Sequence, residues 1–197
     1  EMKVFLDPIP HVVLDQNIPL RGWYKAKHEK DTVRPRPCYT EAILSQPYGG
    51  FCSVGCGFCY INNGNRGYRG QGVTTVDPNY AKKCERQLDK MEISAAIYMS
   101  SFIDPFLELE EHYGNTRALS TAAVERGLPI FFLTRMKVPD WAYDHLKMNP
   151  HSYQQFSINT PDPDDWARLS PRAVSLETML AQEGLTEDGL KSAGRKP

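Results

Sequence analysis

The sequence predicts an α/β fold in which parallel strands, joined by helices, curl into a partial (β/α) barrel of about four strand-helix units. Short apolar runs alternate with longer segments of helical pattern through the middle of the chain. Helical crossovers between parallel strands are right-handed, so a row of such strands can curl. The chain has 197 residues, of which 41% are hydrophobic, enough for a single domain with a buried core.

Residues 1–45 are predicted to form an extended N-terminal arm, because they carry five prolines and no sustained periodicity. Between Arg21 and Arg36 the arm is locally basic, with Trp23 and Tyr24 interleaved. Basic and aromatic residues together can hold a phosphate backbone and stack on bases. A solvated basic segment explains the same composition, so nucleic acid is left open as a partner but is not favoured.

Residues 46–181 are predicted to form the core, and residues 182–197 a polar C-terminal tail without strand pattern. Asp77-Pro78 predicts the start of a helix that runs to about Lys90. The elements expected after it are a strand over 94–99, a helix over 115–126, a strand over 130–133, a helix over 139–148, a strand over 155–158 and a short helix opened by Asp162-Pro163. Functional residues are expected at the carboxyl ends of such strands.

Cys52, Cys56 and Cys59 form a C-x3-C-x2-C motif. Three thiolates can hold three corners of a cubane 4Fe-4S cluster, whose usual complement is four cysteines, so one iron is left open for another ligand. The alternatives are a zinc site or unrelated buried thiols. Zinc normally takes four ligands, and no second pair of Cys or His follows at a suitable distance. Outside the motif, Cys84 is expected to be a buried or half-buried thiol in a helix. Cys38 stands close before the loop, and a ligand or redox role for it is left open but is not favoured.

The cysteines stand in a glycine-rich loop that also carries aromatic residues. A chain wrapped tightly around a cluster needs positive φ angles and close backbone approach. The loop offers glycines for this at Gly49, Gly50, Gly55 and Gly57. Phe58 and Tyr60 flank the last cysteine, and we expect Phe58 to shield one face of the cluster from water.

Composition indicates the compartment in which the protein is expected and the partners that it does not favour. The net charge of −1 argues against wholesale electrostatic attraction to nucleic acid or membrane. No apolar run reaches the ~18 residues that a membrane span requires, and no signal peptide is recognised, so a cytoplasmic protein without a membrane partner is expected. The five cysteines agree with a reducing compartment, where thiols bind metals rather than form a disulfide scaffold.

With this motif the chain resembles the radical S-adenosylmethionine (SAM) superfamily, and within it the spore photoproduct lyase and DNA repair photolyase-like branch. The resemblance covers about residues 46–180. Besides the cysteines it rests on Gln46-Pro47-Tyr48-Gly49-Gly50, Ile103-Asp104-Pro105-Phe106 with Glu110, Phe132-Leu133-Thr134-Arg135, Phe156-Ser157-Ile158-Asn159-Thr160 and Leu169-Ser170-Pro171-Arg172-Ala173.

The resemblance implies a partial barrel of the radical SAM type, with a 4Fe-4S cluster and SAM as cofactors. The open iron would bind the amino and carboxylate groups of SAM. Reduction, supplied by an external donor of the flavodoxin or ferredoxin type, would give a 5'-deoxyadenosyl radical that abstracts hydrogen from a substrate. Neither the substrate nor the reaction type, lyase or transferase, is identified.

The resemblance also assigns roles to polar residues at the strand ends. Residues expected to bind the cofactor are Phe58, Tyr60, Ser100, Ser101, Thr134, Arg135, Ser157 and Asn159. Arg135 could hold the SAM carboxylate with two hydrogen bonds, and Ser157 and Asn159 could bind ribose hydroxyls. Ordinary capping of strand-to-helix turns is the alternative for such residues. Asp104 and Arg135 are the predicted catalytic residues. Asp104, with Glu110, could orient substrate or SAM, or Asp104-Pro105 could simply begin a turn.

The chain departs from the branch at several positions, which suggests a different substrate. Ser101 stands where spore photoproduct lyase has the cysteine that returns a hydrogen atom, and Arg135 replaces a lysine. Ser170-Pro171 replaces Glu-Pro. A sheet of about four strand-helix units would leave an open edge, so the cavity is expected to be completed by a second copy, a partner chain, the N-terminal arm or a large substrate, with self-association slightly favoured. The competing functions are a non-catalytic iron-sulfur electron carrier or sensor, and a nucleic-acid-binding module with a structural cluster.

Overall fold

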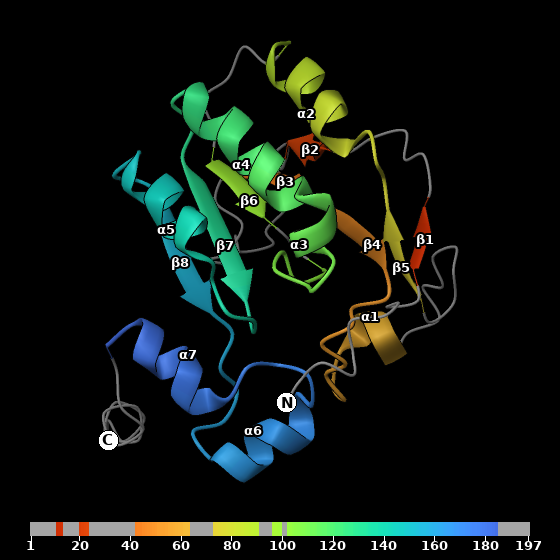
Figure 1. The fold of residues 1–197 in the computed structure, drawn as a ribbon, viewed down its shortest axis with the longest axis vertical. Coiled ribbons are helices and arrows are strands. Elements are labelled where there is room, and N and C mark those ends of the chain that lie inside the picture. The colour runs from red at the N-terminus through yellow and green to blue at the C-terminus, as the bar shows by residue number, and fades with distance from the viewer. Residues whose placement is uncertain are drawn as a thin grey trace, which may run out of the picture.

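The computed structural model describes residues 11–13, 20–23, 42–63, 73–90, 96–99 and 102–184. These residues form two sheets and seven helices (Figure 1). The larger sheet has the strand order β2 (Leu20–Trp23), β3 (Ala42–Ser45), β6 (Ala96–Met99), β7 (Ile130–Thr134) and β8 (Tyr153–Phe156). In this part of the chain, no helix has both the length and the apolar character that crossing a membrane requires.

The larger sheet is mostly parallel. β3 pairs with β6, β6 with β7, and β7 with β8 in parallel register, and β2 pairs antiparallel with β3 at the edge. The predicted α/β fold with a parallel sheet is therefore confirmed. Closure into a barrel is not shown, because β2 and β8 are the edges of the sheet that the described strands form.

Three helices cover one face of this sheet: α2 (Tyr80–Leu88), α4 (Asn115–Glu125) and α5 (Asp140–Lys147) (Figure 1). Alternate residues of β6 and β7 point toward them, since successive side chains of a strand face opposite sides. Met99 and Phe132 are fully buried in this core. Burying each such side chain stabilises the fold by roughly 1.5 to 3 kcal/mol. The helices thus hold the strands in place and leave their carboxyl ends available.

The opposite face of the sheet carries a row of stacked aromatic rings. Tyr98 of β6 stacks on Phe131 of β7 at 4.3 Å between centroids, and Phe131 stacks on Tyr153 of β8 at 4.9 Å. Aromatic pairs at this separation contribute about 0.5 to 1.5 kcal/mol beyond their burial. The row fixes the relative positions of three strands whose ends approach the cysteine loop.

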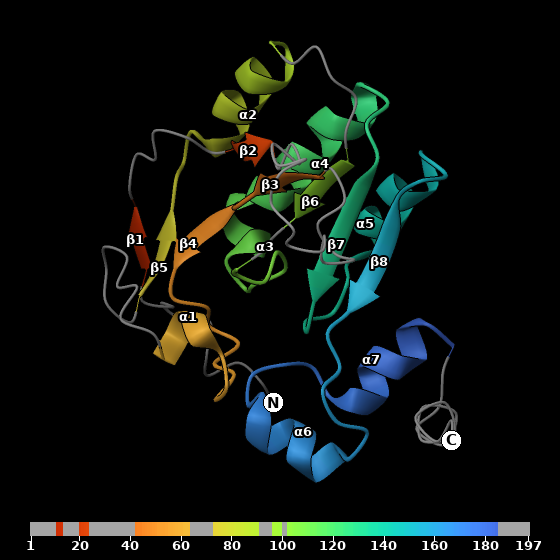
Figure 2. The ribbon, with the colours of Figure 1, turned by 180° about the vertical axis from the view of Figure 1, so that it is seen from behind.

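A smaller sheet, in the order β1 (His11–Val13), β5 (Thr74–Val76) and β4 (Tyr48–Gly50), leads into the cysteine motif. The chain leaves β4, passes through the three cysteines and enters α1 (Tyr60–Asn63). Figures 1 and 2 show this segment on the side of the molecule toward which β7 and β8 point. The remaining helices are α3 (Glu110–Tyr113), α6 (Pro163–Leu169) and α7 (Leu176–Gln182).

Most predicted elements after the motif are found close to their expected bounds. α2, β6, α4, β7 and α5 are confirmed, and Cys84 is fully buried in α2 as expected. The strand expected over 155–158 begins and ends two residues earlier, at Tyr153–Phe156. Helix α7 and the short strands β1 to β5 were not predicted. Three of those strands fall within residues 1–45, and the arm, core and tail boundaries remain a prediction.

Candidate functional site

The three cysteines lie in a compact loop between β4 and α1. The amide of Gly55 donates to the carbonyl of Cys52 at 3.2 Å, and the amide of Cys59 donates to the carbonyl of Cys56 at 3.1 Å. Two successive tight turns therefore present the three side chains. Cys52 and Cys56 are each 8% exposed, and Cys59 is half-buried. The loop packs on an apolar cluster that includes Ile103 and Leu107.

Two of the loop glycines are required by backbone geometry. Gly50 has a φ of +71°, and a Cβ there would lie 2.4 Å from the carbonyl oxygen of Val73. Gly55 has a φ of +69°. L-residues rarely adopt such angles. The prediction is thus confirmed at Gly50 and Gly55, and it is wrong at Gly57, where an added Cβ would meet nothing within 4 Å.

A distant segment, residues 169–172, holds the cysteine loop from the other side. The amide of Gly57 donates to the carbonyl of Leu169 at 3.0 Å, and the amide of Arg172 donates to the carbonyl of Val54 at 3.3 Å. Between these contacts, the buried hydroxyl of Ser170 donates to the sulfur of Cys56 at 3.5 Å. The turn after α6 is thereby fixed to the centre of the motif.

Arg135, the residue after β7, donates hydrogen bonds to several polar side chains that follow the strands. Its Nη1 donates to Oδ1 of Asn159 at 2.9 Å and to Oγ of Ser170 at 3.0 Å. Its Nη2 donates to Oγ of Ser157 at 2.9 Å. A guanidinium suits this arrangement because its planar fork can donate to several acceptors at once.

The guanidinium of Arg135 also lies over two aromatic rings, 5.0 Å from the ring centre of Phe58 and 5.2 Å from that of Trp166. Contacts of this kind favour a cation. Burial lowers the pKa of Arg135, against the opposing attraction of the three motif cysteines and Asp104. The guanidinium is therefore held between two aromatic rings, next to the segment that carries the cysteines.

Asp104 is a buried carboxylate that organises the turn after β7. Its Oδ1 accepts from the hydroxyl of Thr134 at 2.7 Å and from the amide of Phe106 at 3.0 Å. Its Oδ2 accepts from the amide of Arg135 at 2.7 Å. Burial raises the pKa of Asp104 to about 6, although these hydrogen bonds oppose the shift. Because both oxygens accept from protein donors, this geometry gives Asp104 a role in positioning Arg135.

The carboxylate of Glu110 also accepts its hydrogen bonds from groups of the protein itself. It accepts from the hydroxyl of Tyr48 at 2.5 Å, the amide of Thr116 at 2.9 Å and the amide of Arg117 at 2.8 Å. The last two amides belong to the first turn of α4, which has no earlier helical acceptors for them. Glu110 thus caps α4 and ties it to β4, rather than presenting free oxygens to a ligand.

The three thiols of the loop suit a cubane cluster better than a single metal ion. In the described residues, no group of three or more His, Cys, Asp or Glu side chains is arranged around a single metal ion. A cubane takes each thiolate on a different iron, so its ligands need not converge on one point. Burial raises the pKa of Cys52 to about 12, so its thiolate needs a positive partner. Three thiols beside the charge of Arg135 fit such a cluster chemically.

Comparison with known proteins adds an independent finding. Neither a family model nor a solved structure matches the chain. Over 183 residues the chain is 51% identical to a protein of Pseudomonas phage M6 named radical SAM Nalpha-GlyT isomerase. This similarity supports the assignment of the chain to the radical SAM superfamily. The alignment covers 90% of this chain and 38% of that relative, so the chain spans well under half of the relative's length.

Several residues predicted from the radical SAM resemblance meet in the structure. Arg135 donates to both Ser157 and Asn159, and its guanidinium lies over the ring of Phe58. Tyr60 is 55% exposed, and its ring meets that of Phe102 at 6.2 Å between centroids. The predicted residues Ser100 and Ser101 lie outside the described part of the chain.

Two residues of this group were missed by sequence reasoning. Trp166 and Ser170 both contact Arg135; Trp166 lies in the middle of α6 and Ser170 is the residue that follows this helix. The sequence carries a signal at Ser170, which stands where the spore photoproduct lyase branch has Glu, but a departure from that pattern does not by itself indicate a contact with Arg135. No comparable signal marked Trp166, whose helix was expected simply to follow the last strand.

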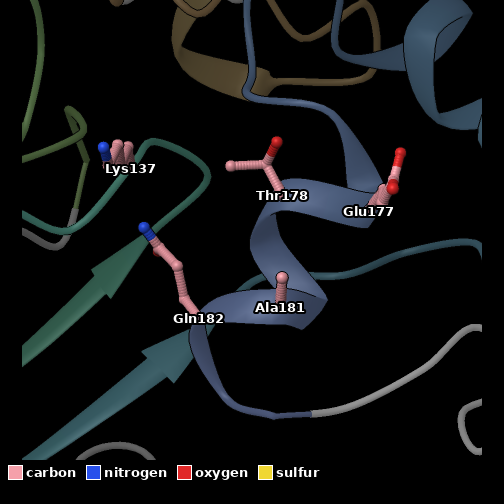
Figure 3. Close-up of a pocket in the computed structure, with 5 residues that line it drawn as sticks. All are labelled: Lys137, Glu177, Thr178, Ala181 and Gln182. Carbon is pink, nitrogen blue, oxygen red and sulfur yellow. The ribbon is translucent and has the colours of Figure 1, made fainter.

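A surface hollow occurs elsewhere, along α7 and the turn after β7. It is lined by Lys137, Glu177, Thr178, Ala181 and Gln182 (Figure 3). None of the predicted site residues lines it. The amide of Val138 donates to Oε1 of Gln182 at 3.3 Å, so this hollow lies where α7 docks against the sheet.

Proposed function

We propose that this chain acts in a radical SAM enzyme, in which Cys52, Cys56 and Cys59 hold a 4Fe-4S cluster and Arg135 faces bound SAM. The observation that carries the proposal is the meeting of Arg135, Ser157 and Asn159 beside the cysteine loop. An electron-transfer or structural cluster needs no such polar group next to it. The name of the phage relative supports the same reading.

The chain's own residues would serve binding and orientation. When bound, the cluster and SAM supply a 5'-deoxyadenosyl radical that removes a hydrogen atom from the substrate. Arg135 would neutralise the SAM carboxylate, a pairing strengthened by the bidentate geometry of a guanidinium. Phe58 and Trp166 would keep water from its faces, which strengthens electrostatic attraction at the site. Asp104 would keep the backbone of Arg135 in place.

We further propose that the reaction is an isomerisation, with Nalpha-GlyT or a close analogue as substrate. The phage relative is named for that activity. An isomerisation in which 5'-deoxyadenosine gives the abstracted hydrogen back to the product radical balances without a separate thiol donor. The sequence is compatible with this route, because Ser101 stands at the branch's thiol position. Membership of the spore photoproduct lyase branch remains a prediction.

The first experiment tests the cluster and SAM cleavage. Anaerobically reconstituted protein should bind about four irons per chain and, with dithionite and SAM, release 5'-deoxyadenosine. Cys56→Ala should lose the cluster, whereas Cys84→Ala, a buried cysteine outside the motif, should keep it. Stoichiometric zinc without visible charge-transfer absorption would contradict the proposal. A stable cluster without SAM cleavage would favour the electron carrier or sensor.

The second experiment tests the substrate. Loaded protein is incubated with SAM, dithionite and Nalpha-GlyT, and the products are separated by chromatography with mass detection. An isomerase yields a product of unchanged mass and altered retention. A product of different mass would show that the chemistry is not an isomerisation, and unchanged Nalpha-GlyT together with SAM cleavage would exclude this substrate.

Two partners belong to the same proposal. An external carrier of the flavodoxin or ferredoxin type would supply the electron. A second copy or a partner chain would cover the open side of the sheet, since an uncovered radical is quenched by solvent. Anaerobic light scattering of the loaded protein, paired with SAM cleavage at several dilutions, tests self-association. A strict monomer with constant activity per chain would exclude the second copy.

A further inference from the structure

We propose that Ser170, oriented by Arg135, makes the cluster easier to reduce by donating a hydrogen bond to the sulfur of Cys56. The inference rests on the proposed function, because it assumes that Cys56 carries a cluster iron. Neither the resemblance nor the name of the relative assigns a role to Ser170. It would be a positioning and charge-stabilising residue rather than a catalytic one, since it contacts a ligand of the cluster and not the substrate.

The direction of the hydrogen bond follows from the surroundings of Ser170. Its oxygen accepts from Nη1 of Arg135 at 3.0 Å. Because a hydroxyl has a single proton to donate, that proton is free to point at the sulfur of Cys56, 3.5 Å away. The guanidinium therefore selects the orientation in which Ser170 donates to the sulfur.

The position of Ser170 is fixed as well as its orientation. The residue is 1% exposed, so water does not compete for its hydroxyl. Its amide donates to the carbonyl of Trp166 at 2.9 Å, and its carbonyl accepts from the amide of Ala173 at 3.0 Å. The flanking contacts of Leu169 and Arg172 with the cysteine loop hold the same turn in place. Such a hydrogen bond persists because the groups on both sides are anchored independently.

The effect on reduction follows from charge. In the reduction step, one electron passes from a low-potential flavin or iron-sulfur carrier to the cluster, and no bond forms or breaks. The added negative charge spreads onto the thiolates. Hydrogen bonds to the sulfurs and nearby positive charge stabilise the reduced state more than the oxidised state, which raises the reduction potential. Ser170 supplies the hydrogen bond, and Arg135 places a positive charge next to the hydroxyl that contacts Cys56.

The test is a redox titration of reconstituted protein, followed by electron paramagnetic resonance of the reduced cluster. Ser170→Ala should lower the equilibrium constant for reduction about tenfold, equivalent to about 59 mV for one electron. Ser170→Thr retains the hydroxyl and should stay close to the wild type. Ser120→Ala is the matched control, because Ser120 of α4 is also buried but pairs with His145 of α5.

The outcomes separate this inference from the proposed function. If the wild type binds no cluster, the proposed function fails. If the wild type binds the cluster, the two proteins can be compared directly. The role of Ser170 is overturned if the equilibrium constants for reduction of wild type and Ser170→Ala agree within a factor of two. If Ser170→Ala does not bind iron, the titration is made on Arg135→Gln instead. This substitution removes the guanidinium that orients the hydroxyl of Ser170. An unchanged potential in Arg135→Gln would then overturn the inference.

Discussion

The backbone amide of Arg135 donates a 2.7 Å hydrogen bond to the carboxylate of Asp104. This contact links the segment after β6 to the end of β7, two strands that are neighbours in the sheet. It fixes the main chain at the point from which the guanidinium reaches Ser157 and Asn159. Of the two predicted catalytic residues, Asp104 therefore holds the backbone in place and Arg135 presents the side chain.

Asp104→Asn should destabilise the fold and weaken SAM binding. An asparagine offers one acceptor oxygen where Asp104 uses two, so its amide group would face either the amide of Arg135 or the donors Thr134 and Phe106. Leaving a buried donor unsatisfied costs about 1 to 3 kcal/mol. Urea unfolding measures this loss. The control Asp89→Asn, at an exposed aspartate, should cost less than about 0.5 kcal/mol. Equal losses in the two variants would rule out the supporting role.

Arg135→Ala should weaken SAM binding without removing the cluster. Truncating one partner of a buried charge pair costs about 2 to 5 kcal/mol of binding. Arg135→Lys should recover only part of this, because an ammonium keeps the charge and loses the planar fork. Equilibrium titration of SAM on samples of equal iron content provides the measurement. Arg168→Ala, at an exposed arginine paired with Asp165, is the control. Unchanged affinity in Arg135→Ala would mean that its guanidinium does not meet SAM.

Gly50→Ala and Gly57→Ala should behave differently although both glycines belong to the cysteine segment. At Gly50 the substitution combines a positive φ with a Cβ 2.4 Å from the carbonyl oxygen of Val73, and should cost roughly 2 kcal/mol or more. At Gly57 it meets open space and should change stability by less than about 0.5 kcal/mol. Thermal unfolding and iron content after reconstitution measure both. Equal losses would show that the loop responds to any added methyl group.

His145 should make stability depend on pH. Burial lowers its pKa below the ordinary 6.5, with Arg117 acting in the same direction and Asp144 and Glu125 opposing it. The unfolded chain therefore binds the proton more readily than the folded chain. Stability from this group is present above about pH 6.5 and is lost as the pH falls through the lower folded value.

The measurement is the free energy of unfolding between about pH 7 and pH 5. Wild type should lose more stability over this interval than His145→Gln, whose side chain does not take up a proton. His151→Gln, at an exposed histidine, provides the comparison for removal of an imidazole. Parallel curves for wild type and His145→Gln would show that His145 does not carry the dependence.

The fold was predictable where local chemistry agrees with tertiary structure. Asp77-Pro78 predicts α2, and the carboxylate of Asp77 accepts from the amide of Asn79, the residue just before the helix begins. β8 was misplaced because its exposed edge position tolerates Gln154 and Gln155, so the apolar pattern that marks a buried strand is absent. The short strands of the smaller sheet gave no signal, since each has only three residues.

The site was predictable to the extent that it follows from strand order. Parallel strands bring their carboxyl ends to one edge, so Arg135 and Ser157 could be expected together. The capping role of Glu110 depends on which amides α4 leaves unpaired, and those are known only once α3 and α4 are placed. Ser170 reaches a sulfur 114 positions away in the chain, a contact that no local pattern encodes.

The contacts between residues 169–172 and the cysteine loop would couple loading of the proposed cluster to the order of distant helices. Gly57 and Val54 each exchange a backbone hydrogen bond with this turn, which joins α6 to the segment leading into α7. Ligands that bind only the folded loop stabilise whatever is fastened to it. Loss of iron would consequently accelerate amide hydrogen exchange in α6 and α7 more than in α4, which is buried against the sheet. The rate of hydrogen exchange in two helices without a motif cysteine would then show whether the proposed metal centre is occupied.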